Sequence, residues 1–333
     1  MGITTKDLAQ LCGVSRTTVH RALHGGGRIH PDTKEMILHM AKEYDYQPDL
    51  LARGLVKGRT YYIGVVVLDV QNRYFSGMLN TISREASKRG YYINITLHDG
   101  DQQQERDQLT RLAAYHMDGI ILSSVNEGEA YREFLNSLGM PIVSVDNKIA
   151  DGIPFVSIDQ RQAMAEAVQL VLEKGYERIV FVCPAMQTKG AQNIYVHQER
   201  RKGFEEARKG HPQVEVQYLL DWSYLDHIEG LTRDAKRTAF LCTADDFALE
   251  IMKQMREKGK NPPVDYGIVG FDNIDTLKYI SPKLVTISNS VDRVSAAAVN
   301  LLFQLIEGKR EACGQENTMC EILPFELMEG ETI

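Results

Sequence analysis

Near the N terminus, several side chains that can donate hydrogen bonds share one face of a short predicted helix. The segment 16–23 has helical spacing, with Val19, Ala22 and Leu23 facing inward. The same spacing leaves four polar side chains pointing outward: Arg16, Thr17, His20 and Arg21. Guanidinium and hydroxyl groups in this arrangement can contact base edges or phosphate oxygens. The pattern alone fits equally well with the charged surface of any small helical bundle.

A second group of polar residues follows predicted strands in the larger, C-terminal part of the chain. It consists mainly of carboxylates, amides and hydroxyls, with two arginines: Asp69 to Phe75 (which includes Arg73), Ser123-Ser124, Asp146-Asn147, Asp159, Arg200, Asp245-Asp246 and Asp272-Asn273. Ligands of open parallel sheets bind beyond the carboxyl ends of the strands, so these residues could surround one ligand. Taken singly, each is more simply explained as a helix cap or a loop residue.

The sequence lacks the common motifs of catalysis and cofactor binding. It has no glycine-rich dinucleotide or phosphate loop, no zinc-protease motif and no nucleophile elbow. The cysteines are scattered, with no spacing typical of a metal or disulfide site: Cys12, Cys183, Cys242, Cys313 and Cys320. We therefore expect no catalytic residues, no metal site and no cofactor.

Composition points to a globular protein of more than one domain. The chain has 333 residues, 43% hydrophobic and 25% charged. No apolar run is long enough to span a membrane, and the N terminus does not resemble a secretory signal, so we expect a cytoplasmic protein. The net charge of −7 is unevenly spread. Residues 1–59 carry nine Lys or Arg and six Asp or Glu, which predicts a basic, nucleic-acid-binding arm on an acidic body.

The first sixty residues contain the start and stop signals of short helices. Thr4 can cap a first helix, with Asp7 three residues later, and Gly13 permits the turn that ends it. Ser15 can cap the second helix, and a third runs from Pro31 to about Tyr44. This spacing predicts a small all-α domain of three helices, in which a tight turn joins the first two.

From Tyr61 onward, apolar runs typical of buried parallel strands alternate with amphipathic helices. The strands are expected at 61–69, 91–97, 119–123, 142–145, 155–158, 178–183, 215–219, 239–242 and 266–270, and the helices at 75–89, 161–174, 245–258 and 291–307. Such alternation predicts two doubly wound α/β lobes with parallel sheets.

Short stretches spread over nearly the whole chain match the sequence pattern of one protein family. In the N-terminal part the matching stretches are Thr4-Thr5-Lys6-Asp7-Leu8-Ala9, the run from Gly13 to Val19, Arg21-Ala22-Leu23 and Tyr46-Gln47-Pro48. In the body they are Asp69 to Phe75, Val143 to Asp146, Val156 to Asp159, Arg200 with Gly203-Phe204, Ala244-Asp245 with Ala248, and Gly270-Phe271-Asp272. In these stretches the chain resembles the LacI/GalR repressor family. The resemblance implies an all-α helix-turn-helix domain joined to an effector domain like the periplasmic sugar-binding proteins.

The resemblance also implies how DNA is bound. In the family the second helix enters the major groove, and a hinge helix pairs with its dimer mate in the minor groove. The residues expected at the DNA are Thr4, Ser15, Arg16, Thr17, Thr18, His20, Arg21, Arg28 and, as the minor-groove wedge, Leu55. The resemblance therefore predicts double-stranded, pseudo-palindromic operator DNA and a second copy of the chain as partners.

For the effector, the resemblance implies a cleft between the two lobes. The expected binding residues are Asp69, Tyr74, Phe75, Asp146, Arg200, Trp222, Asp245 and Asp272. Carboxylates and a guanidinium suit the hydroxyls of a sugar, and an aromatic face suits its apolar side. Two alternatives stay open: Trp222 could instead be a core anchor, and Arg73 could reach an anionic ligand or face solvent.

These features together predict three domains and a regulatory function. We expect a helix-turn-helix domain at 1–47, a hinge at 48–59 and an effector-binding and dimerisation domain at 60–333. Its first lobe should comprise 60–158 and 290–320, and its second 159–289 and 321–333. The expected function is a sequence-specific transcription repressor, not an enzyme, controlled allosterically by a sugar or sugar derivative. The alternative is a sugar-binding or sugar-processing α/β protein with an accessory DNA-binding domain.

Overall fold

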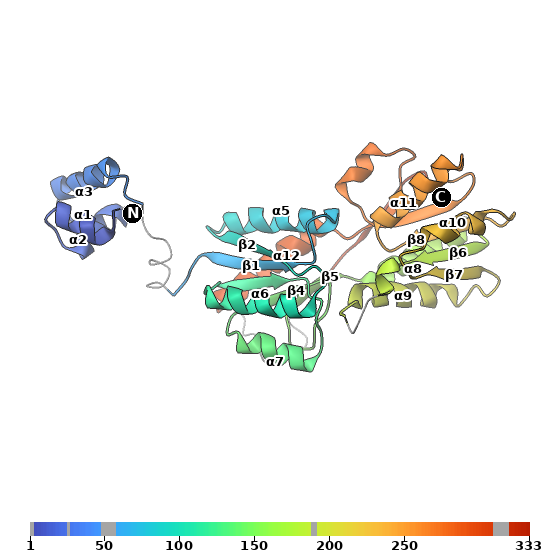
Figure 1. The fold of residues 1–333 in the computed structure, drawn as a ribbon, viewed down its shortest axis with the longest axis horizontal. Helices are drawn as coiled ribbons and strands as arrows, with labels where there is room; N and C mark the ends of the chain where they lie inside the picture. Colours follow the sequence, from blue (N-terminus) through green and yellow to red (C-terminus); the bar gives the residue numbers. More distant parts are fainter. Residues whose placement is uncertain (1–2, 25–26, 48–57, 188–191, 309–319) are drawn as a thin grey trace. The chain divides into compact units, whose positions relative to one another are not determined.

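The computed structural model describes residues 3–24, 27–47, 58–187, 192–308 and 320–333. The chain divides between Tyr61 and Tyr62 into two compact units (Figure 1). The expected hinge residue Leu55 lies outside the described residues, as does most of the expected hinge.

The first unit contains the helices α1 (Thr5–Leu11), α2 (Arg16–His24) and α3 (Pro31–Glu43). A capping box starts α1. The Asp7 amide donates to the Thr4 hydroxyl oxygen at 3.3 Å, and the Thr4 amide donates to the Asp7 carboxylate at 3.0 Å. These bonds satisfy amides that have no partner within the helix, which is why the helix begins here.

The turn between α1 and α2 also follows from local chemistry. Gly13 has a φ of +62°, a left-handed conformation that glycine adopts without steric penalty. The Val14 amide then donates to the Ala9 carbonyl at 3.0 Å. Ser15 starts α2 by accepting the Thr18 amide at 3.1 Å.

Each of these three helices contributes a fully buried side chain to a small common core: Leu8, Val19 and Ile37. Leu11 and Met36 are exposed, although their helical spacing also places them near the inward face. The core of the unit therefore contains fewer side chains than the apolar pattern of the sequence indicates.

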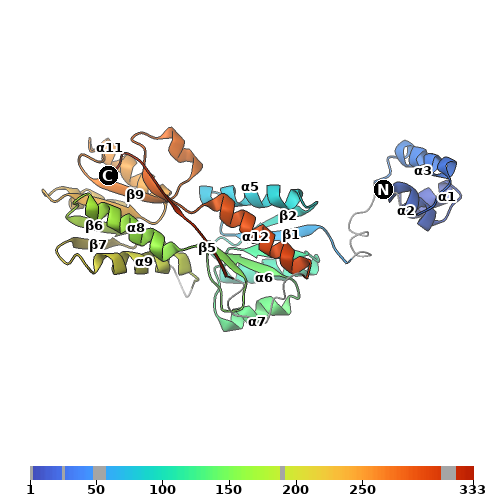
Figure 2. The ribbon, with the colours of Figure 1, turned by 180° about the vertical axis from the view of Figure 1, so that it is seen from behind.

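The second unit has two lobes, each built on one sheet (Figures 1 and 2). The first lobe comprises β1 (Tyr62–Val67), α5 (Arg73–Ser87), β2 (Tyr92–Leu97), α6 (Gln102–Ala114), β3 (Gly119–Leu122), α7 (Glu129–Ser137), β4 (Ile142–Val145), β5 (Phe155–Ile158), α12 (Val291–Ile306) and β11 (Cys320–Leu323). Its strand order is β11-β5-β4-β3-β1-β2, with all neighbours parallel.

The second lobe repeats this plan. It comprises α8 (Gln160–Glu173), β6 (Arg178–Val182), α9 (Tyr195–Arg208), β7 (Glu215–Leu219), α10 (Leu225–Ile228), β8 (Thr238–Cys242), α11 (Asp245–Glu257), β9 (Gly267–Asp272), β10 (Val285–Ser288) and β12 (Glu326–Met328). The order is β12-β10-β9-β8-β6-β7, and only β12 runs antiparallel among the described pairs. Both sheets are doubly wound, so each has a switch point where its strand ends can receive a ligand.

Helices cover both faces of the first sheet, which explains its continuous apolar strands. Leu109 of α6 and Leu135 of α7 pack with Ile120 and Leu122 of β3 on one face. On the other face α12 packs against β3, β4 and β5, beside α5 (Figure 2). No helix among the described residues is both long and apolar enough to cross a membrane.

The chain passes between the lobes three times, at Asp159, at Asn289-Ser290 and at Pro324-Phe325. Because β11 pairs with β5, residues 321–323 belong to the sheet of the first lobe, not to the second lobe as the sequence interpretation had it.

The structure also contains helices that hydrophobic periodicity did not predict, namely α6, α7 and α9. In addition, α5 begins at Arg73, two residues earlier than expected, which brings Tyr74 and Phe75 into its first turn. Both results affect the ligand site described below.

Candidate functional site

The polar face of α2 is exposed, as its helical spacing predicts. Arg16, Thr17, His20 and Arg21 are all exposed, whereas Val19 on the opposite face is fully buried. The face is therefore available to a partner outside the first unit.

Three of the residues expected at the DNA, Thr4, Ser15 and Thr18, also make hydrogen bonds at the start of a helix. The hydroxyl of Thr4 donates to the Asp7 carboxylate at 2.6 Å, and these bonds hold the pKa of Asp7 below its usual range. The Ser15 and Thr18 hydroxyls bond each other at 2.8 Å. Arg28 is exposed in the loop before α3.

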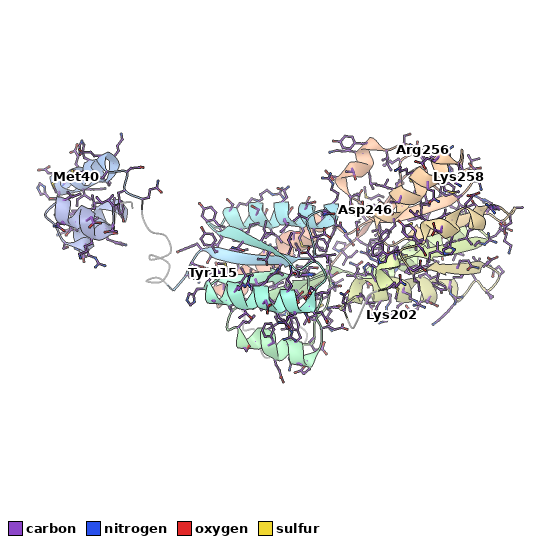
Figure 3. The ribbon with its side chains drawn as sticks, viewed as in Figure 1. Met40, Tyr115, Lys202, Asp246, Arg256 and Lys258 are labelled. Atoms are coloured by element: carbon purple, nitrogen blue, oxygen red, sulfur yellow. The ribbon has the colours of Figure 1, made fainter. Side chains whose placement is uncertain are left out.

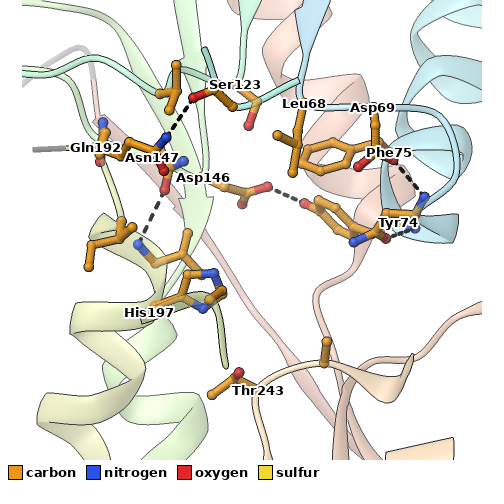
Figure 4. A pocket seen from close by; sticks show the side chains of 18 of the residues that line it. Leu68, Asp69, Tyr74, Phe75, Ser123, Asp146, Asn147, Gln192, His197 and Thr243 are labelled. Atoms are coloured by element: carbon orange, nitrogen blue, oxygen red, sulfur yellow. Dashed lines mark hydrogen bonds between the residues drawn. The ribbon is translucent and has the colours of Figure 1, made fainter. Parts of the chain in front are cut away.

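A cavity of about 360 Å³ lies between the two lobes of the second unit (Figure 4). Its wall includes seven of the eight residues expected to bind the effector: Asp69, Tyr74, Phe75, Asp146, Arg200, Trp222 and Asp272. The first four come from strand ends and the α5 start of the first lobe, and the other three from the second lobe.

The eighth expected residue, Asp245, does not line the cavity. Its carboxylate accepts the Thr286 hydroxyl at 2.6 Å and the Ile274 amide at 2.9 Å, deep inside the second lobe. A Cβ at Gly270 would lie only 2.1 Å from its Oδ1, so the strand approaches this carboxylate closely. Burial raises the pKa of Asp245 to about 7. Asp245 is thus a structural residue at the start of α11, and its neighbour Asp246 faces the cavity instead.

Asp146, directly after β4, is a buried carboxylate in the first lobe's part of the cavity wall. It accepts hydrogen bonds from the Tyr74 hydroxyl, drawn in Figure 4, and from the Ser157 hydroxyl at 3.1 Å. Its φ of +61° turns the residue at the end of β4, a conformation that costs energy outside glycine and is common at functional sites. Burial raises the pKa of Asp146 above its ordinary value, since the low-dielectric site disfavours the charged form.

Asp272 takes the matching position at the end of β9, also with a positive φ of +110°. It accepts from the Asn289 side chain at 2.6 Å and from the Arg200 guanidinium at 3.5 Å. Arg200 also donates to Gln160 at 2.8 Å and lies 3.6 Å from the centre of the Phe271 ring. Burial raises the pKa of Asp272 well above its usual range, although Arg200 opposes the rise.

The position of Arg200 depends on close packing of two helices. A Cβ at Gly203, one turn further along α9, would lie 2.0 Å from the Arg161 carbonyl oxygen of α8. Only glycine lets α9 approach α8 this closely, and this approach carries Arg200 into the cavity wall.

The structure decides both alternatives that the sequence left open. Trp222 is 63% exposed and its ring meets Phe247 edge-on at 6.1 Å, so it is a wall residue and not a core anchor. Arg73 is exposed and is not part of the cavity wall.

Several further residues of the wall are not among the eight expected to bind the effector: His98, Asn147, Gln192, Asn193, His197, Asp246 and Asn289. Of these, the sequence places Asn147 and Asp246 in the group that follows the strands. His98 and Asn289 each follow a strand, a signal that was available once those strands were recognised. His197 lies three residues before Arg200 on α9, but the helix itself was not predicted.

His197 is an uncharged polar group in this wall. Burial lowers its pKa to about 3, helped by the nearby charge of Arg200. Among the described residues, none lies within hydrogen-bonding distance of its Nδ1. The imidazole is therefore neutral at physiological pH.

Hydrogen bonds join the first turn of α9 and the residues just before it to the first lobe. We call this set of bonds the inter-lobe clasp, and its second-lobe residues are Gln192, Asn193 and Val196. The Asn193 amide donates to Val125 at 2.8 Å, and its side chain donates to two further carbonyls of the first lobe. Gln192 donates to the Gly100 carbonyl at 2.7 Å, and the Val196 amide donates to Asn147 at 3.3 Å. The clasp ties the start of the helix that carries His197 and Arg200 to the opposite lobe.

Within the described part of the chain, no group of three or more His, Cys, Asp or Glu side chains could hold a metal ion.

Two family descriptions match the chain. Residues 4–49 match bacterial regulatory proteins of the lacI family, and residues 63–310 match the periplasmic binding protein domain. These ranges correspond to the helical unit and to the two-lobed unit.

Individual proteins match over almost the full length. Catabolite control protein A of Priestia megaterium is 30% identical over 91% of this chain and 92% of its own. The lac repressor dimer bound to operator and the anti-inducer ONPF aligns with a TM-score of 0.84 and 19% identity, covering 100% of this chain and 99% of that one. A LacI family regulator from Enterococcus faecium with bound ribose aligns with a TM-score of 0.69 and 24% identity, covering 81% and 98%. The two structures establish the likeness of fold.

Proposed function

This chain belongs to the lacI family of bacterial regulatory proteins and is a DNA-binding regulator rather than an enzyme, and from that premise we propose that it is a repressor whose operator affinity is set by a sugar held between its two lobes. The observation that carries the proposal is the cavity wall. It combines carboxylates, a guanidinium and aromatic rings from both lobes, so a ligand bound there changes how the lobes meet.

The DNA-reading surface is the polar face of α2. Arg16 and Arg21 have the planar fork that matches the O6 and N7 acceptors of guanine in the major groove. Thr17 can contact a thymine methyl group, and His20 extends the same face. All four side chains are exposed, which this role requires.

Phosphate contacts come from the edges of this surface. Of the Ser15 and Thr18 hydroxyls, one donates a hydrogen bond to the other. The accepting hydroxyl can therefore donate its own hydrogen bond to a phosphate oxygen. Arg28 adds an exposed positive charge. The Thr4 hydroxyl already donates to Asp7, so a phosphate contact by Thr4 needs that bond to be exchanged.

The hinge at 48–59 completes DNA binding, with Leu55 as the wedge between base pairs in the minor groove. Two copies of this segment meet at the centre of the operator, so a change in how the lobes of the two copies meet alters operator affinity.

A sugar fits the cavity chemistry. The Asp146 and Asp272 carboxylates can accept hydroxyl protons, and Arg200 can donate to hydroxyl oxygens. The exposed Trp222 ring offers an apolar face for the C–H side of a sugar. The related Enterococcus faecium regulator holds ribose, which agrees with this class of ligand.

The acting species is a homodimer on a pseudo-palindromic operator, in the cytoplasm where the DNA lies. Two-fold symmetry of the protein matches two half-sites of the operator. The first lobe offers an apolar surface for a second copy along its edge strand β2, where Tyr92 is 62% exposed, Ile95 is 45% exposed and Tyr92 stacks with Tyr62 at 5.5 Å. The lac repressor, which has the same fold, binds its operator as a dimer.

Fluorescence anisotropy of labelled operator DNA, titrated with the full-length protein with and without candidate sugars, tests the proposal. We expect one sugar to change the operator Kd, and the operator to change the Kd of that sugar by the same factor, because coupling between sites is reciprocal. A sugar that binds the protein without changing operator affinity would contradict the control mechanism. Binding to random DNA as tight as to the operator would contradict sequence-specific repression.

A further inference from the structure

The charged side chains in the cavity wall are strongly unbalanced. Among the described residues, four carboxylates line it, with a single guanidinium: Asp69, Asp146, Asp246 and Asp272, with Arg200. Figure 3 labels Asp246 at the start of α11, on the side of the second lobe that faces the first. The described part of the wall holds no lysine.

The guanidinium of Arg200 is largely committed to the protein. It donates to Gln160 at 2.8 Å, to the Thr243 carbonyl, and to Asp272 at 3.5 Å, while Phe271 covers one face. Its charge is balanced by Asp272, so it leaves no net positive charge for an anionic ligand.

The other three carboxylates form no ion pair within the part of the chain that the structure describes. Asp146 is held by hydroxyl groups, and Asp69 by the amides of Gln71 and Asn72, both at 2.8 Å. Asp246 is half-buried, and burial raises its pKa. Within the described residues, no Lys or Arg comes within ion-pair distance of these three carboxylates.

The remaining titratable groups around the cavity do not supply the missing positive charge. His98 accepts the Gly100 amide at its Nδ1 at 3.1 Å, and its Nε2 lies 3.0 Å from the Ser123 carbonyl oxygen, so both ring nitrogens already contact the first lobe. His197 is neutral. Lys148 pairs with Asp151 at 2.7 Å, outside the wall. The charge of Arg73 lowers the pKa of Asp246, but Arg73 is exposed and outside the wall.

We propose that the effector is a carbohydrate without an anionic group, either uncharged or carrying an ammonium group, and that this wall rejects sugar phosphates and sugar acids. A phosphate group carries a charge of about −1.5 to −2 at neutral pH. In this cavity that charge would lie next to carboxylates, which repel it. Hydroxyl and ammonium groups instead donate to these carboxylates. The inference rests on the proposed function, because it takes the cavity as the effector site.

Matched ligands on the full-length protein test this selectivity. Isothermal titration would compare glucose, galactose, ribose and fructose with the corresponding phosphates, with glucuronate and galacturonate, and with glucosamine and galactosamine. We expect at least one neutral or amino sugar to bind, and its phosphate or acid form to bind at least roughly 100-fold more weakly, as like charges a few ångströms apart predict. Comparing the neutral sugars with glucosamine and galactosamine shows whether the effector is uncharged or carries an ammonium group.

The outcomes separate this inference from the proposed function. An anionic sugar that binds more tightly than its neutral parent would overturn the charge selectivity and leave sugar control intact. Failure of every sugar to bind would overturn the proposed function, and this inference with it.

Two variants test the origin of the selectivity. Asp246→Asn removes one unbalanced charge with little change of shape, and the preference for the neutral sugar over its phosphate should fall by roughly tenfold. Asp69→Asn keeps an oxygen for the Gln71 and Asn72 amides and should act in the same direction, which covers the case of a poorly folded Asp246 variant. Glu257→Gln, the same kind of change at the exposed far end of α11, should leave the preference unchanged. Equal preference in all three variants and the parent protein would overturn the electrostatic explanation.

Discussion

The inter-lobe clasp gives the sharpest prediction, through the substitution Asn193→Ala. The side chain is only 4% exposed and makes three hydrogen bonds. Its Nδ2 donates to the Asn126 carbonyl at 3.1 Å and the Lys148 carbonyl at 3.0 Å, both in the first lobe. Its Oδ1 accepts the Tyr195 amide at 3.1 Å, in the first turn of α9.

Alanine removes all three bonds and leaves two carbonyls and an amide without their partner. At about 1 kcal/mol for each lost bond, the free energy of unfolding should fall by about 3 kcal/mol. In a domain of this size each kcal/mol corresponds to roughly 2–4 °C, so Tm should fall by about 6–12 °C. Effector affinity should fall too, because the clasp holds the helix of His197 and Arg200 against the first lobe.

Thermal unfolding of the effector-free protein measures the first effect, and titration with the identified sugar measures the second. Asn136→Ala on α7 is the matched control, since it deletes the same amide from an exposed position. The control should change Tm by less than about 2 °C. An unchanged Tm for Asn193→Ala would refute the assigned bonding, and a lower Tm with unchanged sugar affinity would reduce the clasp to a purely structural role.

Four further substitutions have defined outcomes. Asp245 has a folded pKa of about 7, above its ordinary value of 3.8, so its protonated form favours folding and stability should fall by up to about 4 kcal/mol as pH rises from 4 to 7. Asp245→Asn should flatten this dependence in urea unfolding at pH 5 and pH 8, and parallel curves would contradict the assignment. Leu55→Ala should weaken operator binding strongly in a gel-shift titration while thermal unfolding stays unchanged, and full operator affinity would exclude the wedge. Arg16→Ala should reduce the preference for operator over random DNA, whereas Thr18→Ala should weaken binding to both alike, and equal losses for Arg16→Ala would count against base reading.

The helical unit could be predicted from the sequence because its signals are local. The capping box of Thr4 and Asp7, the left-handed turn at Gly13 and the cap at Ser15 each act within four residues. What the sequence could not show is how wide the core would be. Leu11 is exposed because the three helices meet over a smaller area than their apolar stripes.

The cavity could be predicted in outline because strand ends of parallel sheets gather at one edge, and this placed Asp146 and Asp272 correctly. The prediction failed where two carboxylates are adjacent. Asp245 and Asp246 are equivalent in type, and only the packing of Gly270 and Thr286 around Asp245 turns one inward and leaves the other to the cavity.

The sequence by itself determined the family, the two-part organisation and the residues at the strand ends, since these depend on short-range patterns and on the alternation of strands and helices. Only the tertiary structure showed the course of α9, the inter-lobe clasp and the excess of negative charge in the cavity. The sequence of α9 is mostly charged and polar, and the partners of its first turn lie far away along the chain. The charge balance at a site depends on distances between such segments, and these distances exist only once the two lobes have folded against each other.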